Sequence, residues 1–230
     1  MNFDRESTLY ANRWIVDKKL VELTWGNVSC IDRETNQVFI KPSGVDLDNL
    51  KEQEISVLNL EGVLLDGKKQ SVDTPTHLEI YKRFPQINCV IHTHSKYATI
   101  FSQSKKDIPC LGTTHADYFY GKIPCVDYTT PKQTLENYEE KTGKNICDWF
   151  NPSAYAGADP LEIGACLVSN HGVFCWDSTV KGALERAYVL EIVAEMAYKS
   201  LLLNNNSGMP KYLIDKHYLR KRGKNKYYGQ

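Results

Sequence analysis

The spacing of apolar positions predicts both strands and helices, with hairpins rather than a regular strand–helix alternation. Two stretches, 55–67 and 165–177, each hold two apolar segments around a polar turn, which is typical of a β-hairpin. The run from Cys89 to His92 is apolar and partly β-branched, and it predicts a further strand. Another alternating stretch ends at Lys41. Short strands joined by tight turns are therefore expected to build the sheet.

Apolar residues at helical spacing predict the helices, and capping residues set their starts. Ser7 is the expected N-cap of the first helix, and Thr74 that of the second, with Pro75 at its first position. Ser178 is expected to cap a long helix with one apolar stripe. The helices are expected over 7–21, 75–84, 136–150 and 179–203. No repeat or linker divides the chain, so 1–230 is expected to be one domain.

The composition and the net charge argue against two classes of partner, nucleic acids and membranes. The formal net charge of +0 argues against nucleic acid as a partner. No apolar run approaches the roughly 20 residues that span a bilayer, and the N-terminus lacks a signal-peptide pattern, so we expect a cytoplasmic protein without a membrane partner. The seven cysteines lack a zinc spacing, and most are expected to be small buried hydrophobes.

The candidate chemistry begins with two histidines one residue apart. His92 and His94 follow an apolar strand, and side chains at positions i and i+2 of a strand share a face. His171 lies between two apolar segments far downstream. Catalytic zinc commonly takes three protein ligands and leaves a position open, so this trio favours a metal site. The alternative is three separate histidines with ordinary hydrogen bonds.

Several motifs in order, GNVS, KPSG, SVDTPTH, IHTHS, THADYFYG, SNHG and the terminal YYGQ, resemble the class II aldolase/epimerase family. The resemblance implies a single α/β domain whose central, mainly antiparallel sheet is flanked by helices on both faces. It places zinc, with manganese or cobalt as substitutes, on His92, His94 and His171, with Asp73 as a carboxylate ligand. Asp73 also suits a helix start, where a carboxylate meets free amide donors.

The resemblance implies a phosphate pocket as well. Gly26, Asn27, Ser43, Gly44, Ser71 and Val72 occupy the matching positions. Glycine lets backbone amides approach an anion and serine adds a hydroxyl donor, although each residue alone is an ordinary turn former. Lys41 lies beside the set and could add positive charge. Val72 departs from the pattern, because the family usually has a second serine there.

The epimerase branch of the family inverts carbon 4 of L-ribulose 5-phosphate to give D-xylulose 5-phosphate. Carbon 4 has no adjacent carbonyl, so the expected route breaks the bond between carbons 3 and 4 through an enediolate and remakes it. The resemblance assigns proton transfer to Asp117 and Tyr228. It also implies a homotetramer in which the tail, 211–230, completes a neighbouring subunit's site.

Two further histidines have weaker assignments. If 115–117 were a strand, His115 would share a face with Asp117 and could orient it, and a structural role is an equal alternative. His77 is expected to pack near the metal ligands rather than bind the metal.

Other functions stay open at this point. An aldolase would cleave a phosphorylated ketose and release the aldehyde, but aldolase relatives tend to carry glutamate where Asp73 stands. A scaffold is a third alternative, because cytoskeletal proteins use this fold without the metal ligands. The sequence leaves the pathway open between arabinose breakdown and another pentose route such as ascorbate utilisation.

Overall fold

The computed structural model describes residues 3–47, 49–151, 159–203 and 208–229. These residues form an 8-stranded sheet with the order β4-β3-β2-β1-β5-β8-β7-β6. The neighbouring strands are antiparallel except for β6 and β7, which are parallel. The strands are β1 (Asn27–Asp32), β2 (Gln37–Ile40), β3 (Ser56–Leu58), β4 (Leu64–Asp66), β5 (Cys89–Thr93), β6 (Cys125–Val126), β7 (Ala165–Val168) and β8 (Gly172–Asp177).

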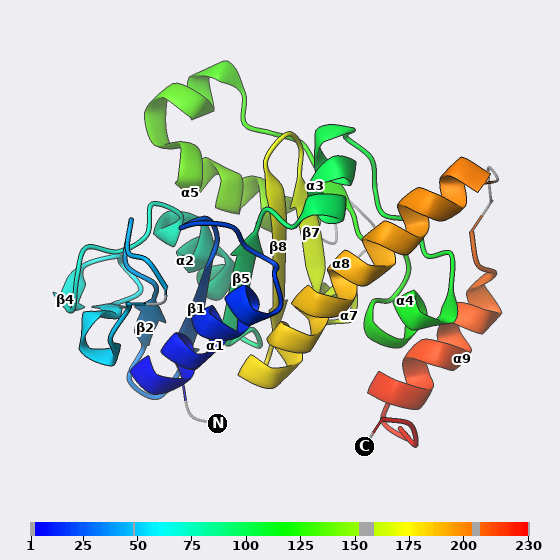
Figure 1. Ribbon diagram of the computed structural model, residues 1–230, viewed down its shortest axis with the longest axis horizontal. Helices are drawn as coiled ribbons and strands as arrows, with labels where there is room; N and C mark the ends of the chain where they lie inside the picture. Colours follow the sequence, from blue (N-terminus) through cyan, green and yellow to red (C-terminus); the bar gives the residue numbers. More distant parts are fainter. Residues whose placement is uncertain (1–2, 48, 152–158, 204–207, 230) are drawn as a thin grey trace.

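Helices cover both faces of this sheet (Figure 1). One buried cluster lies between the sheet and α1, α3 and α8, and a second lies between the sheet and α2 and α5. The helices are α1 (Arg5–Asp17), α2 (Thr74–Arg83), α3 (Lys96–Gln103), α4 (Thr113–Tyr118), α5 (Pro131–Trp149), α7 (Pro160–Ile163), α8 (Val180–Leu203) and α9 (Lys211–Arg222), with a 3₁₀ turn at Glu52–Glu54. The predicted α/β domain with a central, mainly antiparallel sheet is confirmed.

Both predicted hairpins are present because their turns supply residues that accept a left-handed backbone. The β3–β4 connection contains Gly62 at φ +85°, a conformation that glycine adopts without strain. The β7–β8 connection contains Asn170 at φ 60°, and asparagine tolerates this region better than most residues. The second hairpin carries His171 in its turn, directly before β8.

Some helix starts differ from the sequence-based prediction. The cap of α1 is Asp4, whose carboxylate accepts from the backbone amide of Ser7, so the expected cap lies one turn inside the helix. Asp73 rather than Thr74 is the N-cap of α2. At the start of α8, the amide of Gly182 donates to the hydroxyl of Thr179, one residue after the expected cap. In each case a polar residue of a type common at helix starts lies within three positions of the expected cap, although Asp73 makes no side-chain capping hydrogen bond.

The predicted helix 136–150 begins earlier than expected. Helix α5 starts at Pro131, after the N-cap Thr130, and contains a non-helical residue, Asn137, at φ −147° and ψ 72°. A proline in the first turn is compatible with helix, because its missing amide has no helical partner there. The predicted start at residue 136 therefore lies beside the kink, and the first segment of the helix, from Pro131, was missed.

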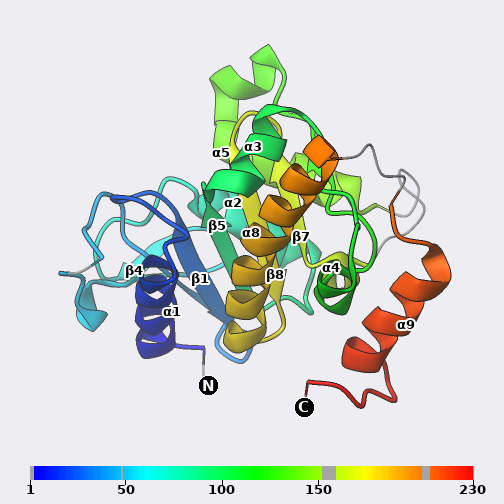
Figure 2. The same ribbon diagram turned by 45° about the vertical axis from the view of Figure 1, so that its right-hand side comes forward.

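Helix α9 packs along α4, at the side of the molecule opposite β4 (Figure 2). Hydrogen bonds also join α9 to the end of β8, where Arg222 donates to Asp177 at 2.9 Å, and to the segment after α4, where the Tyr120 hydroxyl donates to Asp215 at 2.6 Å. Tyr218 is buried at the contact, with its ring 5.1 Å from that of Tyr120. The C-terminal segment is therefore docked against its own chain.

Two composition-based expectations can be compared with the structure. Six of the seven cysteines are buried, and Cys125 is half-buried, as expected for small apolar side chains. Among the described residues, no helix combines the length and apolar character needed to cross a membrane.

Candidate active site

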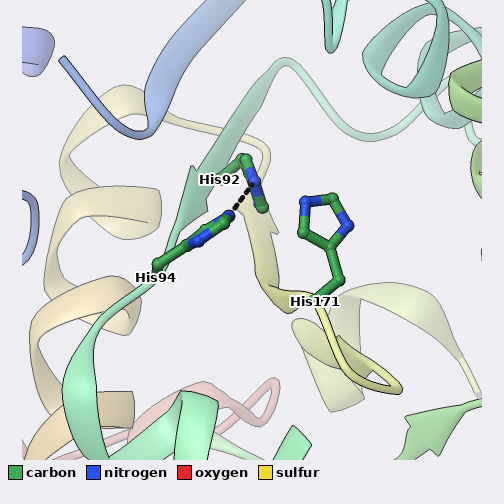
Figure 3. Close-up of side chains that lie close together, drawn as sticks. All are labelled: His92, His94 and His171. Atoms are coloured by element: carbon green, nitrogen blue, oxygen red, sulfur yellow. Dashed lines mark hydrogen bonds between the residues drawn. The ribbon is translucent and has the colours of Figure 1, made fainter. Parts of the chain in front are cut away.

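The three histidines come together where β5 meets the β7–β8 turn (Figure 3). In the strand register, His92 lies opposite Asn27 of β1 and opposite Phe174 of β8. His94 follows the end of β5, and its ring lies beside that of His92. His171 approaches from the turn before β8, so residues 77 positions apart share one site.

The spacing of the imidazole nitrogens suits one metal ion. One ligand atom from each of His92, His94 and His171 lies within 4.8 Å of the others. The Nε2 atoms of His92 and His94 are 3.1 Å apart. Two nitrogens bound at about 2.05 Å in a tetrahedral site would be about 3.3 Å apart. Nδ1 of His92 donates to the carbonyl of Val173 at 3.0 Å, which leaves its Nε2 as the free electron-pair donor.

The electrostatics of the site also suit a cation. Burial lowers the pKa of His92 to about 3 and lowers those of His94 and His171, so the imidazoles are neutral and can act as ligands. Stacking against Phe174, with ring centroids 4.2 Å apart, holds the His92 ring in place. A divalent ion therefore fits both the spacing and the charge state of these residues.

Asp73 lies at the N-cap of α2 and lines the same pocket. Burial alone would raise its pKa, but the imidazoles of His92 and His77 and a hydrogen bond from Asn27 lower it below its usual value. That bond joins Nδ2 of Asn27 to Oδ2 of Asp73 at 2.7 Å. The group within 4.8 Å consists of the three imidazoles and does not include Asp73. The carboxylate is thus oriented by Asn27 at the edge of the trio.

The candidate phosphate residues line this pocket too. The cavity is about 390 Å³ and is lined by the candidate metal and phosphate residues, Gly26, Asn27, Ser43, Gly44, Ser71, Val72, Asp73, His92, His94 and His171, together with Thr24, Trp25 and Lys41. The sequence motifs, although far apart in the chain, therefore converge on one cavity.

Gly26 is the position in this pocket where only glycine fits. Its φ is +74°, and a Cβ there would lie 2.6 Å from Cγ1 of Val21 and 2.8 Å from the carbonyl oxygen of His92. The backbone turn can therefore lie directly against the strand that carries the first histidine.

Lys41 adds a buried positive group to the pocket. The residue is 3% exposed, and Nζ donates to the carbonyl of Thr24 at 3.1 Å. Burial lowers its pKa, partly offset by Asp73 and Asp46. A lysine in this position can bind an anion that enters the pocket.

Two exposed apolar side chains stand at the pocket rim. Val72 is 62% exposed, and Trp25 is 53% exposed with its ring centroid 6.3 Å from that of His94. Val72 offers no hydroxyl to the cavity it lines.

Asp117 and Tyr228 do not line this pocket. Asp117 lies on α4, where Nε and Nη2 of Arg220 donate to its two oxygens at 3.1 and 3.0 Å. Nδ1 of His217 also lies 3.2 Å from Oδ1 of Asp117. The ring of Tyr228 lies against the same guanidinium, with its centroid 4.2 Å from Cζ of Arg220. The two candidate proton-transfer residues are therefore grouped with each other, apart from the metal candidates.

The remaining histidines have structural contacts. Residues 115–117 lie in the helix α4 rather than in a strand, and Nε2 of His115 donates to the carbonyl of Gly121 at 2.7 Å. The proposed orientation of Asp117 by His115 has no contact to support it, because positions i and i+2 of a helix do not face each other. His77 is fully buried, with Nδ1 2.7 Å from the hydroxyl of Ser29. A packing position beside the metal candidates is what the sequence predicted for it.

Two residues near the candidate groups could not be recognised from the sequence. Arg220 stands in the sequence as one of several basic residues of the tail, and Tyr138 belongs to no motif. The hydroxyl of Tyr138 on α5 lies 3.4 Å from Nδ1 of His171. No local pattern marks either residue, since both contacts join elements far apart in the sequence.

Comparisons with known proteins identify the family and the fold of this chain. Residues 6–198 match the model of the Class II Aldolase and Adducin N-terminal domain. An L-fuculose 1-phosphate aldolase has 22% identity and a TM-score of 0.78, with 93% of each chain covered. The YgbL protein of Escherichia coli has 21% identity and a TM-score of 0.74, covering 92% of this chain and 96% of its own. L-fuculose-1-phosphate aldolase of Thermus thermophilus has 21% identity and a TM-score of 0.66, covering 88% and 97%. At these identities, the solved structures establish the shared fold.

Proposed function

Because this chain belongs to the class II aldolase and adducin N-terminal domain family, we propose that it is a zinc-dependent L-ribulose-5-phosphate 4-epimerase. The observation that carries the proposal is the shared cavity, in which three neutral imidazoles lie beside turns and a buried lysine suited to an anion. A sugar phosphate has both a metal-chelating end and a phosphate, so it matches the two kinds of residue that line this cavity. A cytoplasmic location is part of the same proposal.

In this proposal, His92, His94 and His171 hold the ion, and Asp73 adds a carboxylate. A bound divalent ion supplies a Lewis acid that accepts charge from the ketone and hydroxyl oxygens of the substrate. Asn27 fixes the Asp73 carboxylate through the 2.7 Å hydrogen bond. Zinc is the first choice for a three-histidine site, and manganese or cobalt would be tolerated substitutes.

In the same proposal, the glycine and serine residues of the cavity bind the phosphate together with Lys41. Gly26 and Gly44 have positive φ, at +74° and +65°, and let the backbone lie close to the anion. Ser43 and Ser71 supply hydroxyl donors, and Lys41 supplies charge from a buried position. Only the backbone amide of Val72 can contribute to phosphate binding, because its side chain has no donor.

The reaction requires two proton-transfer groups. The hydrogen on carbon 4 is not acidic, so the bond between carbons 3 and 4 breaks instead, as a base removes the proton from the carbon 4 hydroxyl. The released glycolaldehyde phosphate turns so that its other face points to carbon 3, and the bond between carbons 3 and 4 forms again. An acid then returns a proton to the carbon 4 oxygen. That oxygen is then on the opposite side, so the base and the acid are different residues. We assign these roles to Asp117 and Tyr228.

We further propose that a neighbouring copy supplies both of these groups. They lie together against Arg220, and neither lines the pocket of its own chain. The face formed by α4 and α9 would then dock beside the metal pocket of the next subunit, and a closed ring such as a homotetramer would repeat this contact. The tail, 211–230, completes the neighbouring site in this arrangement.

A class II aldolase that cleaves a phosphorylated ketose is the second candidate, since the same residues catalyse its first step. The two outcomes differ in whether the aldehyde leaves before the bond forms again. An assay with metal-replete protein and L-ribulose 5-phosphate therefore measures both D-xylulose 5-phosphate and free glycolaldehyde phosphate. Epimerase activity predicts D-xylulose 5-phosphate with little free aldehyde, and a chelator should abolish turnover that added zinc restores.

The same assay tests a non-catalytic scaffold. Purified protein with no bound divalent ion, no gain on adding zinc or manganese, and no product would contradict the proposed enzyme. Accumulation of free aldehyde would instead identify an aldolase. A panel of other pentulose and tetrose phosphates would then show which substrate the cavity prefers.

A further inference from the structure

We propose that Tyr138 is a positioning residue for the metal centre: its hydroxyl oxygen accepts a hydrogen bond from Nδ1–H of His171 and thereby fixes that ring with Nε2 toward the metal. The inference rests on the metal site of the proposed function. The observation is the 3.4 Å approach of the Tyr138 hydroxyl to Nδ1 of His171. The two rings lie with their centroids 6.1 Å apart.

The orientation of the His171 ring supports this role. Figure 3 shows one ring nitrogen of His171 on the edge that faces His92 and His94, and the other on the far edge. The nitrogen near Tyr138 is Nδ1, so the nitrogen that faces the other two imidazoles is Nε2. His171 thus has a ligand atom on one edge and a protein partner on the other.

The proton on each imidazole decides whether it can bind a metal. A neutral imidazole has one protonated nitrogen, and only the other nitrogen has an electron pair for a metal. His92 meets this condition through Val173, whose carbonyl can only accept and therefore holds the proton on Nδ1. For His171, the phenol oxygen of Tyr138 is the group placed to do the same. Without an acceptor there, the His171 proton could sit on either nitrogen.

The kink in α5 puts Tyr138 in this position. Asn137 has φ −147° and ψ 72°, so the helix is interrupted directly before Tyr138. The hydroxyl of Thr142 then donates to the carbonyl of Tyr138 at 2.8 Å, within the first turn after the kink. Tyr138 is therefore placed by the start of a new helical segment rather than by the helix that precedes it.

Helix α5 in turn packs against α2, the helix whose N-cap is Asp73. The hydroxyl of Thr76 on α2 donates to the carbonyl of Glu139 at 2.6 Å. Gly143 allows the close approach, because a Cβ there would lie 2.8 Å from Cβ of Glu79 and 3.0 Å from Cα of Thr76. The packed pair of helices α2 and α5 therefore positions both the candidate carboxylate ligand and the group that orients His171.

The test compares zinc affinity, measured by competition with a chromophoric chelator, for the wild type and Tyr138→Phe. The substitution keeps the ring and removes only the oxygen. Loss of a partner that orients a metal ligand typically weakens metal binding by about 10-fold to 100-fold, and we expect a loss in this range. Tyr188→Phe is the matched control, since Tyr188 on α8 packs against Trp14 and is not among the residues that line the pocket. We expect this control to bind zinc as the wild type does.

A second measurement needs no variant. Nitrogen NMR of the metal-free wild type, in which no ion fixes the tautomer, should show a proton on Nδ1 of His171 and none on Nε2. Unchanged affinity in Tyr138→Phe, or a proton found on Nε2 of His171, would overturn the role of Tyr138 while the metal site itself stood. Absence of zinc binding by the wild type would overturn the proposed function instead, so the two failures are distinguishable.

Discussion

Arg220 donates two hydrogen bonds, of 3.1 and 3.0 Å, to the carboxylate of Asp117, a residue 103 positions earlier in the sequence. The same guanidinium lies 4.2 Å from the ring centroid of Tyr228. A planar guanidinium can make both contacts at once, whereas a lysine ammonium cannot reproduce the two-point contact. Arg220 therefore links the two groups to which we assign proton transfer.

Replacing Arg220 is expected to impair turnover rather than metal binding. Arg220→Met removes both contacts, so kcat should fall by about tenfold or more, because a misplaced catalytic group loses rate steeply. Zinc content should not change, since Arg220 is not among the residues that line the metal pocket. Steady-state kinetics and metal analysis of the same preparation measure both quantities. Arg220→Lys should recover little, and Lys224→Met is the control, with wild-type kinetics expected. Wild-type kcat in Arg220→Met would remove Arg220 from the mechanism.

Mixed oligomers test whether the site is shared between subunits. His94→Ala removes a metal candidate, Tyr228→Phe removes a proton-transfer candidate, and each variant alone should be nearly inactive. In a random mixture of the two chains, about one site in four would be intact. Such a site combines a pocket that has His94 with a neighbour's tail that has Tyr228, and each is present in half of the chains. Activity of refolded or co-expressed mixtures measures this recovery.

The control mixture combines His94→Ala with Asp73→Asn, because both defects then lie in the same pocket and no intact site can form. Recovery in the first mixture alone supports shared sites. If the first mixture stays inactive, Tyr228 does not act on the pocket of another copy.

A substitution at Val72 is expected to strengthen binding of the phosphorylated substrate. Val72→Ser would add a hydroxyl at a pocket position that is 62% exposed. Since a hydrogen bond to a charged group contributes about 1.5 kcal/mol or more, KM for the phosphorylated substrate should fall by roughly tenfold with little change in kcat. Val63→Ser, on the β3–β4 hairpin and also exposed, is the control. An unchanged KM would mean that the phosphate does not reach residue 72.

The burial of His115 is expected to make the folded protein less stable at low pH. Burial lowers its pKa to about 4 in the folded chain, from its usual value of 6.5. As the pH falls below 6.5, His115 is protonated in the unfolded chain but stays neutral in the folded chain. This favours unfolding, so the free energy of unfolding falls between pH 6.5 and about pH 4. The full loss in the free energy of unfolding is about 3 kcal/mol, at about 1.4 kcal/mol per unit of pKa.

Urea unfolding at pH 7, 6 and 5 measures this effect. His115→Gln removes the titrating group, so its free energy of unfolding should change less with pH than that of the wild type. His77 and His92 are present in both proteins, and their contributions cancel in the comparison. Equal pH slopes for the two proteins would contradict a lowered pKa of His115 in the folded chain.

The elements that could be predicted from sequence are those fixed by local chemistry. The β7–β8 hairpin follows from two apolar segments and a turn that tolerates positive φ at Asn170. The pairing of His92 with His94 follows from their spacing at the end of a strand. His171 could be added only because the apolar segments around it predicted a turn, and the family resemblance placed it with the other two.

The contacts that could not be predicted depend on docking between distant helices. The contacts of Arg220 and His217 with Asp117 arise because α9 docks against α4, more than 90 positions earlier in the chain. Tyr138 reaches His171 only because α5 kinks at Asn137 and packs against α2. Neither the kink nor the docking leaves a periodic pattern in the sequence, so both needed the three-dimensional structure.

The most direct test of the central claim is NMR of L-ribulose 5-phosphate incubated with zinc-replete protein in heavy water. We predict that D-xylulose 5-phosphate forms without deuterium at carbon 4, because the carbon 4 hydrogen stays in place while the bond between carbons 3 and 4 breaks and forms again. No product, or product that carries deuterium at carbon 4, would contradict the proposed reaction.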